Sequence, residues 1–178
     1  MYKLIKRIFD ILASGLALVI LSPIFVITSI GIKISDPGPI FYYAKRVGQN
    51  EKVFNMFKFR SMTIDNNANE SRLTADKSRI FKFGQFIRST KIDELPQLIN
   101  VFIGQMSIIG PRPAAVDQIE ITRNGEYSII SKLKPGLSGP SALYDYIYGD
   151  TIEDEDEYRK LVLPTRLKLD VYYNNHKS

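Results

Sequence analysis

The sequence contains no cysteine, and its only histidine, His176, lies two residues from the end of the 178-residue chain. Without cysteine there can be no disulfide framework, thiolate enzyme or cysteine-histidine zinc site. A serine hydrolase with a histidine base would have to recruit His176, and no G-x-S-x-G motif precedes it. The phosphate-binding motifs G-x-x-x-x-G-K-[ST] and G-x-G-x-x-G are also missing. If the chain is an enzyme, its chemistry must therefore rest on other groups.

The composition indicates one folded domain, because 44% of the residues are hydrophobic and charges of both signs are present. The net charge of +5 is unevenly distributed. Residues 1–149 carry 19 basic and 12 acidic side chains, whereas residues 150–178 carry 5 and 7. We expect the basic part to bind an anionic partner. Nucleic acid, anionic lipid headgroups and phosphate-bearing small molecules all suit such a surface, and charge alone does not rank them.

The N-terminal part contains 22 consecutive uncharged residues, from Ile11 to Ile32. That length suffices to span a hydrocarbon core of about 30 Å. It exceeds the apolar region of a secretory signal peptide, and no clear A-x-A cleavage site closes it, so we do not expect cleavage. The sequence therefore predicts a membrane segment over residues 1–34, followed by a second unit over residues 35–178.

Ser22 and Pro23 interrupt this apolar segment near its middle. Proline removes a backbone donor and clashes with the preceding turn, so the helix should bend there. Basic residues lie on both sides of the segment, and the positive-inside rule consequently gives no orientation for a span. A re-entrant hairpin and a kinked transmembrane helix both remain open from these observations. Ser22 could hydrogen-bond a carbonyl group that the bend leaves without its partner.

The next part of the chain predicts a β-hairpin, with strands over 40–45 and 52–62 and a turn near 47–50. In the second strand Lys58 and Arg60 alternate with phenylalanines, which places both cations on one face. That face is either a solvated outer surface or a paired phosphate clamp.

Three further segments have recognisable patterns. Residues 80–88 mix phenylalanines with cations, as in an amphipathic helix that lies in a headgroup layer or against a core. Residues 114–133 predict a helix, and the acidic run 153–157 predicts a solvated helix start. Residues 65–77 are polar and predict a loop.

The segment 88–102 is the most informative, because Asp93 and Glu94 stand at the predicted start of a helix. Thr90 or Asp93 suits the N-cap, and Pro96 fits only a first turn. A helix N-terminus favours negative charge, so Asp93 should stay ionised there. The alternative is ordinary capping chemistry, in which the two carboxylates have no catalytic role.

The surroundings favour catalysis. A Mg²⁺ ion commonly takes one or two carboxylates together with substrate phosphate oxygens, which suits an Asp-Glu pair. With no histidine base nearby, a carboxylate that acts directly as a nucleophile becomes attractive. The cations that we consider for phosphate binding are Lys58, Arg60, Arg88 and Arg112. Arg112 stands between two prolines, which stiffen its backbone, although an arginine in a proline-rich surface turn would look the same.

Ten short motifs occur in order along nearly the whole chain. They are Lys6-Arg-Ile-Phe-Asp10, Leu21-Ser-Pro23, Pro37-Gly-Pro-Ile-Phe41, Arg46-Val-Gly48, Lys58-Phe-Arg-Ser-Met62, Asp93-Glu-Leu-Pro-Gln97, Gly104-Gln-Met-Ser107, Gly110-Pro-Arg-Pro113, Lys134-Pro-Gly136 and Leu169-Asp-Val-Tyr-Tyr173. This ordered set resembles the bacterial sugar transferases, the monotopic phosphoglycosyl transferases.

The resemblance implies an α/β fold, mostly α, in a monotopic membrane protein. Its N-terminal hairpin would be re-entrant with a break at Ser22 and Pro23, and a small β-hairpin and interfacial amphipathic helices would surround the active site. The catalytic unit, residues 35–178, would lie on the cytoplasmic face of the bacterial inner membrane. The implied partners are a UDP-sugar, polyprenol phosphate and membrane lipids, and not nucleic acid; a homodimer is left open.

The implied reaction transfers a phospho-sugar from the UDP-sugar to polyprenol (undecaprenyl) phosphate and releases UMP, as the first membrane step of bacterial glycoconjugate synthesis. By resemblance Asp93 is the nucleophile that forms a covalent phospho-sugar intermediate. Glu94 shares Mg²⁺ binding with Asp93, and Arg88 pairs with the polyprenol phosphate. The donor by analogy is a UDP-hexose or an N-acetylated UDP-hexosamine derivative.

One stretch departs from the family pattern. After Lys-Pro-Gly the family commonly has a Thr-Gly-Trp-Ala-Gln type sequence and then an arginine, whereas residues 137–146 here differ and no arginine follows before Arg159. Tyr144 or Tyr146 could replace the missing contact to the donor. Two readings from other classes also remain, namely a membrane-anchored basic binding module and a catalytically inert scaffold in a polysaccharide-synthesis complex.

Overall fold

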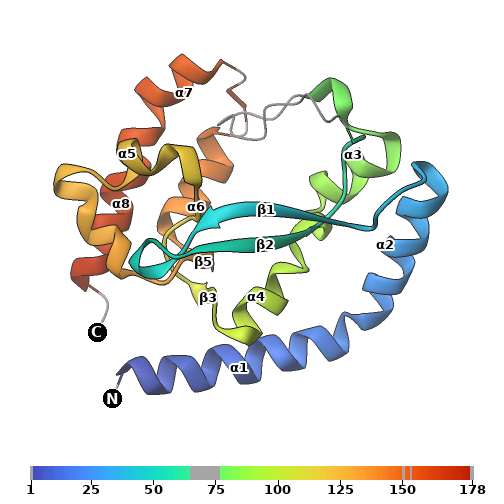
Figure 1. Ribbon diagram of the computed structural model, residues 1–178, viewed down its shortest axis with the longest axis horizontal. Helices are drawn as coiled ribbons and strands as arrows, with labels where there is room; N and C mark the ends of the chain where they lie inside the picture. The colour runs from blue at the N-terminus through green and yellow to red at the C-terminus, as the bar shows by residue number, and fades with distance from the viewer. Residues whose placement is uncertain (1, 65–76, 150, 153, 177–178) are drawn as a thin grey trace.

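The computed structural model describes residues 2–64, 77–149, 151, 152 and 154–176, and it shows a mixed α/β, mostly helical fold (Figure 1). The predicted loop at 65–77 and the first residue of the acidic run, Glu153, lie wholly or largely outside the described residues. The helices are α1 (Tyr2–Ile20), α2 (Ser22–Ser35), α3 (Lys82–Ser89), α4 (Gln97–Ile103), α5 (Ile119–Thr122), α6 (Pro140–Tyr144), α7 (Glu155–Leu161) and α8 (Leu163–His176). Short 3-10 segments are η1 (Gln49–Glu51), η2 (Lys77–Arg79), η3 (Ile92–Glu94), η4 (Val116–Gln118) and η5 (Gly125–Lys132), and η6 (Asp145–Gly149) is a π-helical turn.

The predicted break in the N-terminal segment is confirmed, since α1 and α2 meet at Leu21 with a bend of 58°. Pro23 has no amide hydrogen to give the Val19 carbonyl, and the Ser22 hydroxyl donates to that carbonyl at 2.8 Å instead. Ser22 thus satisfies the group that the proline leaves without its helical partner. Among the described residues, no single helix is long and apolar enough to cross a membrane; α1 and α2 meet that criterion only together, as a bent pair.

Polar side chains of α1 tie this helix to the rest of the molecule. Arg7 donates from its two terminal nitrogens to the carbonyls of Val101 and Phe102, both at 2.7 Å. The buried carboxylate of Asp10 accepts from the backbone N–H of Ile108 at 3.0 Å. Lys6 donates to the Ser107 hydroxyl. In Figure 1, α1 accordingly runs along the lower edge of the molecule, directly beside α4.

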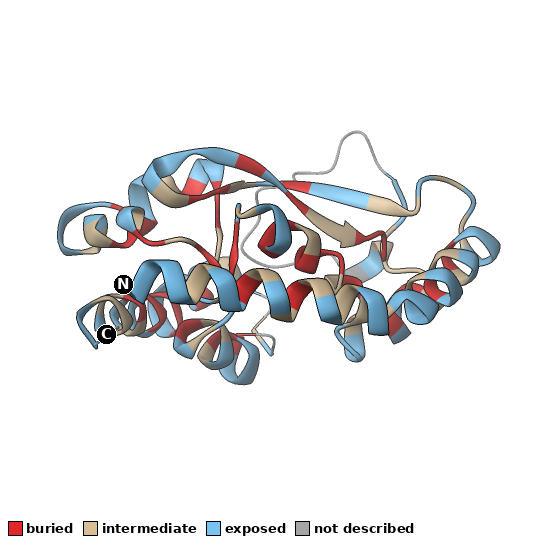
Figure 2. Cartoon of the chain, turned by 90° about the horizontal axis from the view of Figure 1, so that it is seen from below, coloured by how far each residue is buried: buried red, intermediate tan, exposed pale blue. Residues whose placement is uncertain are grey.

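The opposite side of α1 and α2 is apolar and exposed. Figure 2, which views the molecule from this side, shows α1 in front with most of its residues exposed. These exposed side chains include Leu4, Ile5, Ile8, Phe9, Leu12, Leu16, Val19, Ile20, Val26, Ile27, Ile30 and Ile34. A contiguous surface of this kind is unusual on a protein that is surrounded by water.

The predicted hairpin is also confirmed. Strands β1 (Phe41–Val47) and β2 (Val53–Phe59) pair antiparallel, with Tyr42 opposite Lys58. Strand β4 (Ala114–Ala115) adds to the other edge of β1, which gives the order β2-β1-β4. Strands β3 (Ser107–Ile109) and β5 (Gly136–Ser138) form a separate parallel pair. The hairpin crosses the front of the molecule in Figure 1 and brings its outer strand, β2, against α4.

The core-facing reading of the segment 80–88 is confirmed for one side of α3. Ile87 is fully buried against Ile32 and Phe59, whereas Phe86 is exposed. Gly31 lets α2 approach α3 closely, because a Cβ at this position would lie 2.5 Å from the Phe83 ring. Helix α3 therefore faces the core with one side and presents an aromatic ring on the other.

The prediction of one helix over 114–133 is wrong. The segment consists of β4, η4, the single turn α5 and η5, and η5 begins at Gly125 with φ +56°. The acidic run does begin a helix, because the Asp154 carboxylate caps α7 by accepting from the Glu157 N–H at 2.8 Å. Helices α7 and α8 then pack on η5 around Ile130 and Tyr158.

Candidate active site

The candidate site forms where the outer edge of β2 meets the start of α4, and Asn100 joins the two. Its buried side-chain amide donates to the Asn55 carbonyl at 2.8 Å, and its oxygen accepts from the Phe57 N–H at 2.9 Å. These are the hydrogen bonds that a neighbouring strand would otherwise make with β2. Asn100 thus holds β2 in a fixed position against α4. Because Lys58 follows Phe57 in β2, its position is fixed as well.

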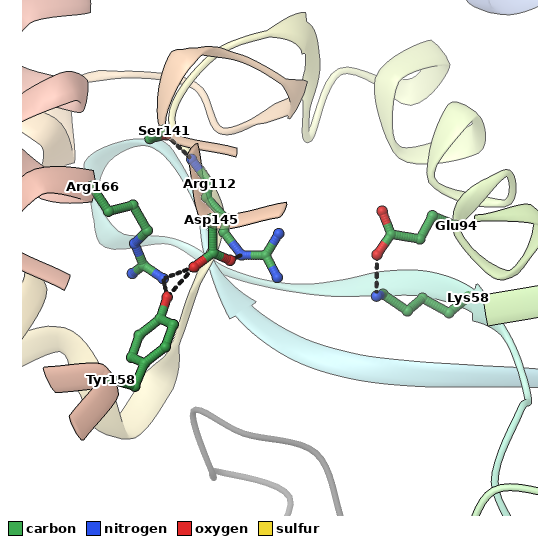
Figure 3. A network of polar contacts seen from close by, with 7 residues as sticks. All are labelled: Lys58, Glu94, Arg112, Ser141, Asp145, Tyr158 and Arg166. Atoms are coloured by element: carbon green, nitrogen blue, oxygen red, sulfur yellow. Dashed lines mark hydrogen bonds and ion pairs between the residues drawn. The ribbon is translucent and has the colours of Figure 1, made fainter. Parts of the chain in front are cut away.

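Lys58 contacts the predicted carboxylate pair directly. Its Nζ lies 2.8 Å from Oε1 of Glu94, in a partly buried ion pair (Figure 3). Glu94 and Lys58 line one pocket together with Arg112, Arg46 and Gln97. The structure therefore brings together residues that are far apart in the sequence: Lys58 from β2, Glu94 from η3 and Arg112 from the loop before β4.

The local structure around Asp93 differs from the predicted helix start. Asp93 and Glu94 lie in the 3-10 turn η3, which follows Lys91 in a left-handed conformation with φ 57°. Helix α4 begins later, and its N-cap is Pro96 rather than Thr90 or Asp93. Thr90 instead ends α3, where its hydroxyl donates to the Phe86 carbonyl. The tight turn directs Asp93 inward, so that only 4% of it is exposed.

The two neighbouring carboxylates have different electrostatic environments. Burial raises the pKa of Asp93, and the charges of Lys58, Arg88 and Lys91 only partly oppose this. This direction is opposite to the one expected from a helix N-terminus. Burial would raise the pKa of Glu94 as well, but Lys58, Arg112 and Lys91 together lower it to about 2. Glu94 is therefore ionised at neutral pH, and Asp93 is the more basic member of the pair.

The predicted phosphate-binding arginines fall into two groups. Arg88, on α3, is close enough for its charge to act on Asp93, and its Nη1 lies 4.0 Å from the Met62 sulfur. Arg112 lines the pocket. Arg60 does not join them: it is 4% exposed and its guanidinium binds the Asp36 carboxylate and the Pro39 carbonyl. The paired clamp of Lys58 and Arg60 is therefore not formed, because Arg60 closes the turn after α2.

Several residues of the site were missed by the sequence analysis. Arg46 and Gln97 line the pocket, and the buried Asp145 forms an ion pair with Arg112. The period-two pattern of β1 places Arg46 on the same side as the buried Ala44, and this signal could have identified it. No local pattern marks Asp145, because its partner is 33 positions away in the chain.

The tyrosines of the divergent stretch have different positions. Tyr146 is exposed and its ring lies 4.4 Å from the Lys91 ammonium, in a cation-π contact beside the carboxylate pair. Tyr144 packs against Tyr148, with ring centroids 4.7 Å apart, and contacts the cluster around Tyr158. Of the two suggested replacements for the family arginine, Tyr146 is the one next to the candidate site.

The donor set of the site fits Mg²⁺ that is shared with a substrate. Asp93 and Glu94 offer two carboxylates, and Glu94 is ionised at neutral pH. Within the described residues no group of three or more His, Cys, Asp or Glu side chains could hold a metal ion. A Mg²⁺ ion that takes one or two carboxylates needs its remaining ligands from water and phosphate oxygens, and the neighbouring cations suit a phosphate.

Known proteins are similar to this chain along most of its length. The model of the family described as bacterial sugar transferase matches residues 1–178. The chain is 41% identical over 137 residues to the UDP-glucose:undecaprenyl-phosphate glucose-1-phosphate transferase of Klebsiella pneumoniae, a match that covers 75% of this chain and 30% of that protein. It is 35% identical over 178 residues to the UDP-N-acetylgalactosamine-undecaprenyl-phosphate N-acetylgalactosaminephosphotransferase of Aeromonas hydrophila, covering 97% of this chain and 39% of that one.

A shorter relative matches as well. The exopolysaccharide production protein ExoY of Rhizobium meliloti is 35% identical over 150 residues, which cover 75% of this chain and 66% of ExoY. The chain thus spans about a third of the length of the two transferases and about two thirds of ExoY.

Proposed function

Because the chain belongs to the bacterial sugar transferase family, we propose that it transfers a sugar phosphate from a UDP-sugar to polyprenol phosphate. The products are a polyprenol diphosphate sugar and UMP. The observation that carries this proposal is the pair of adjacent carboxylates, of which Asp93 is buried and Glu94 lines a pocket together with Lys58 and Arg112. The relatives with 41% and 35% identity are named for sugar-phosphate transfer to undecaprenyl phosphate.

In the first step, Asp93 is the nucleophile. One of its carboxylate oxygens bonds to the sugar-bearing β-phosphorus of the donor, while the bond from that phosphorus to the oxygen bridging to the α-phosphate breaks. UMP leaves with the electron pair on this oxygen, and the sugar phosphate remains on Asp93 as an acyl phosphate ester. Burial of Asp93 supports this role, because it removes water that would otherwise stabilise the carboxylate and compete for the phosphorus.

In the second step, an oxygen of the polyprenol phosphate attacks the same phosphorus and displaces the Asp93 carboxylate. The carboxylate is thereby regenerated. Arg88 is a partner for the incoming lipid phosphate, because its charge already acts at Asp93. Arg112, Lys58 and Arg46 lie on the pocket side, where the donor's phosphates would bind.

Asp93 and Glu94 would hold Mg²⁺ in this site. When bound, the ion supplies a positive charge that neutralises the developing negative charge on the phosphate oxygens. Lys58 keeps Glu94 ionised for that task, and the loss of Lys58 would therefore affect the metal indirectly.

We further propose that the exposed apolar side of α1 and α2 lies in the cytoplasmic leaflet of the bacterial inner membrane, and that the bend at Ser22 and Pro23 returns the chain to its original side. The apolar surface and the 58° bend support this placement. It would put the carboxylate pair at the interface, where a lipid phosphate and a water-soluble nucleotide can meet.

The experiment is nucleotide release from the purified full chain in nanodiscs with Mg²⁺, a short polyprenol phosphate and a panel of UDP-sugars, with UMP and UDP separated. We expect UMP with at least one donor, and its loss in Asp93→Asn by a factor of about 10³ or more, as for other catalytic groups. Asp156→Asn, on the exposed side of α7, is the matched control and should retain activity. Release of UDP instead would show transfer of the sugar without its phosphate and contradict the mechanism.

Two other classes are separated by the same assay. An inert scaffold or a basic binding module would release neither nucleotide with any donor, and Asp93→Asn would behave as the unmodified chain. A binding module for nucleic acid would in addition show affinity that falls steeply with salt.

A further inference from the structure

Asp145 lies against Arg112 in the part of the chain that departs from the family pattern. Its Oδ2 is 2.9 Å from Nε of Arg112, and only 4% of Asp145 is exposed. Asp145 begins the π-helical turn η6, a type of turn that often occurs at functional sites. Figure 3 shows the Arg112 side chain between Asp145 on one side and Glu94 on the other.

The other oxygen of the Asp145 carboxylate, Oδ1, is held by residues of α7 and α8. The Tyr158 hydroxyl, from α7, donates to Oδ1, and Nη1 of Arg166, from α8, donates to the Tyr158 oxygen at 2.8 Å. Both partners are 4% exposed. Burial raises the pKa of Tyr158 to about 12, so the hydroxyl keeps the proton that it donates. The contacts with Tyr158 of α7 and Arg166 of α8 therefore fix the orientation of the Asp145 carboxylate.

This arrangement constrains Arg112 at both ends. Its backbone stands between Pro111 and Pro113, and its N–H lies 3.4 Å from the Ser141 hydroxyl. Its Nε faces Asp145, while 40% of the side chain is exposed along the pocket that Glu94 also lines. In Figure 3 the terminal nitrogens of Arg112 lie beyond its Nε, on the side that faces Glu94 rather than Asp145.

The charges around Asp145 make this compatible with an anionic ligand. A lone carboxylate next to a phosphate site would repel the ligand, but Asp145 stands between two guanidinium groups, those of Arg112 and Arg166, at 2.9 and 4.0 Å. The three groups together carry a net charge of +1. Of the three side chains, Arg112 is the most exposed. Asp145 can therefore orient this cation without cancelling its attraction for an anion.

We propose that Asp145 is a positioning residue that orients Arg112 toward the diphosphate of the donor. This inference rests on the proposed function for the identity of the ligand, a nucleoside diphosphate sugar. The divergent stretch then compensates for its missing arginine by fixing an arginine that the chain already has. Asp145 does not contact the donor in this role, and it acts only through Arg112.

The test is a double-mutant cycle of Asp145→Asn and Arg112→Gln, read as KM and kcat for the donor in the UMP-release assay. Asp145→Asn should raise the donor KM by about tenfold, the size of one charge-assisted contact, with kcat changed by about twofold at most. In the Arg112→Gln background the same change should add nothing. Independent, multiplying effects of the two substitutions would overturn the proposal.

Two further variants separate positioning from folding. Asp156→Asn removes the charge of an exposed carboxylate on α7 and should leave the donor KM within about twofold. Tyr158→Phe removes the hydroxyl behind Asp145 but leaves Asp145 and Arg112 in place, and it should raise the donor KM by a smaller factor than Asp145→Asn. An equal rise in KM for all three would indicate a general loss of structure and contradict the proposal. Thermal unfolding of each variant shows whether it is folded, and if Asp145→Asn does not fold, Tyr158→Phe takes its place in the cycle.

Binding of UDP with Mg²⁺, measured by calorimetry, repeats the cycle without turnover. If the unmodified chain releases no UMP but the cycle still shows coupling in UDP binding, the proposed reaction fails and the positioning role stands. If UMP is released normally and the two effects are independent, the reaction stands and the positioning role fails.

Discussion

Asp93 and Glu94 are adjacent in the chain, yet their pKa values are displaced in opposite directions. The 3-10 turn η3 directs Asp93 into the protein, where burial raises its pKa, and leaves Glu94 at the pocket, where Lys58 and Arg112 lower the value to about 2. Two carboxylates with different basicity can have different tasks. In the proposed reaction the more basic Asp93 attacks phosphorus and the ionised Glu94 contributes negative charge to the metal site.

Replacing Lys58 by methionine should make the kcat/KM of UMP release fall at acid pH. Without the ammonium group, only Arg112 and Lys91 still oppose burial, and the pKa of Glu94 rises from about 2 toward its ordinary value of 4.5. At pH 4.5 up to about half of Glu94 is then protonated, and we expect kcat/KM to fall up to about twofold between pH 8 and pH 4.5 relative to the unmodified chain. Lys52→Met, an exposed lysine in the turn of the same hairpin, is the control. Parallel profiles of the two variants would show that Lys58 does not act through Glu94.

Asp170→Asn should change how stability depends on pH. Burial raises the pKa of Asp170 to about 6, although Ser141 and Arg166 oppose this. The folded chain therefore keeps a proton that the unfolded chain releases near 3.8, and stability falls as pH rises between these values. The corresponding loss is on the order of 1–3 kcal/mol. The difference in Tm between Asp170→Asn and the unmodified chain should shift in favour of the variant by several degrees from pH 4 to pH 7. A constant difference, like that expected for the exposed Asp156→Asn, would contradict the assignment.

Asn100→Ala should destabilise the chain and weaken catalysis together. It leaves the Asn55 carbonyl and the Phe57 N–H without their side-chain partners, at a cost of about 2–4 kcal/mol for two lost buried hydrogen bonds. Since Asn100 sets the position of β2 against α4, Lys58 should also lose its fixed distance to Glu94. The measurements are Tm and kcat for UMP release. Asn55→Ala is the control, because only the backbone carbonyl of Asn55 takes part. Equal losses in both variants would show that the Asn100 side chain does not hold β2 against α4.

The absence of native cysteine allows the proposed hairpin topology to be tested with single introduced cysteines. Lys3→Cys, in α1, and Lys45→Cys, in β1, should both react with an impermeant maleimide in inside-out vesicles and be protected in right-side-out vesicles. Labelling of Cys at position 3 from the periplasmic side would show a spanning segment and refute the hairpin.

The same labelling tests what maintains the bend. Pro23→Ala restores an amide donor for the Val19 carbonyl, yet α1 remains tied to the body through Arg7 and Asp10. We therefore expect Pro23→Ala alone to keep position 3 on the cytoplasmic side, and Pro23→Ala combined with Arg7→Ala and Asp10→Ala to expose part of the population on the other side. Complete inversion by Pro23→Ala alone would mean that the proline, and not the ties of α1, determines the topology.

Local sequence patterns predicted the local features of this fold. Alternation and turn residues located the hairpin of β1 and β2, and Pro23 located the bend, because both depend on neighbouring residues. The ordered motifs predicted the family and pointed to Asp93 and Glu94. Long-range pairing was beyond such patterns: Arg60 looked equivalent to Lys58, and only the fold shows that it binds Asp36. The strand-like and 3-10 conformations within 114–133 were likewise imposed by packing on β1 and α8.

The pairing of Arg112 with Asp145 is a second case of this kind. An arginine between two prolines was visible in the sequence, but its orientation depends on a carboxylate in the divergent stretch and on two helices that follow it. Substitutions there can change the site although no catalytic motif is touched.

The contacts of Lys6, Arg7 and Asp10 with residues 101–108 give α1 a role beyond attachment. They join the helix to the segment that follows the carboxylate pair. In the proposed membrane placement, the apolar side of α1 would therefore set the distance of the carboxylate pair from the membrane surface. A flexible linker would let the site lie at many distances from the lipid phosphates. The contacts of α1 would restrict it to a single distance in the proposed placement. One residue inserted between Asp10 and Ser22 would rotate the remaining apolar side by about 100° against its polar contacts. A chain altered in this way would keep its hydrophobicity, but in the proposed reaction it would present Asp93 and Glu94 at the wrong angle to the lipid phosphate.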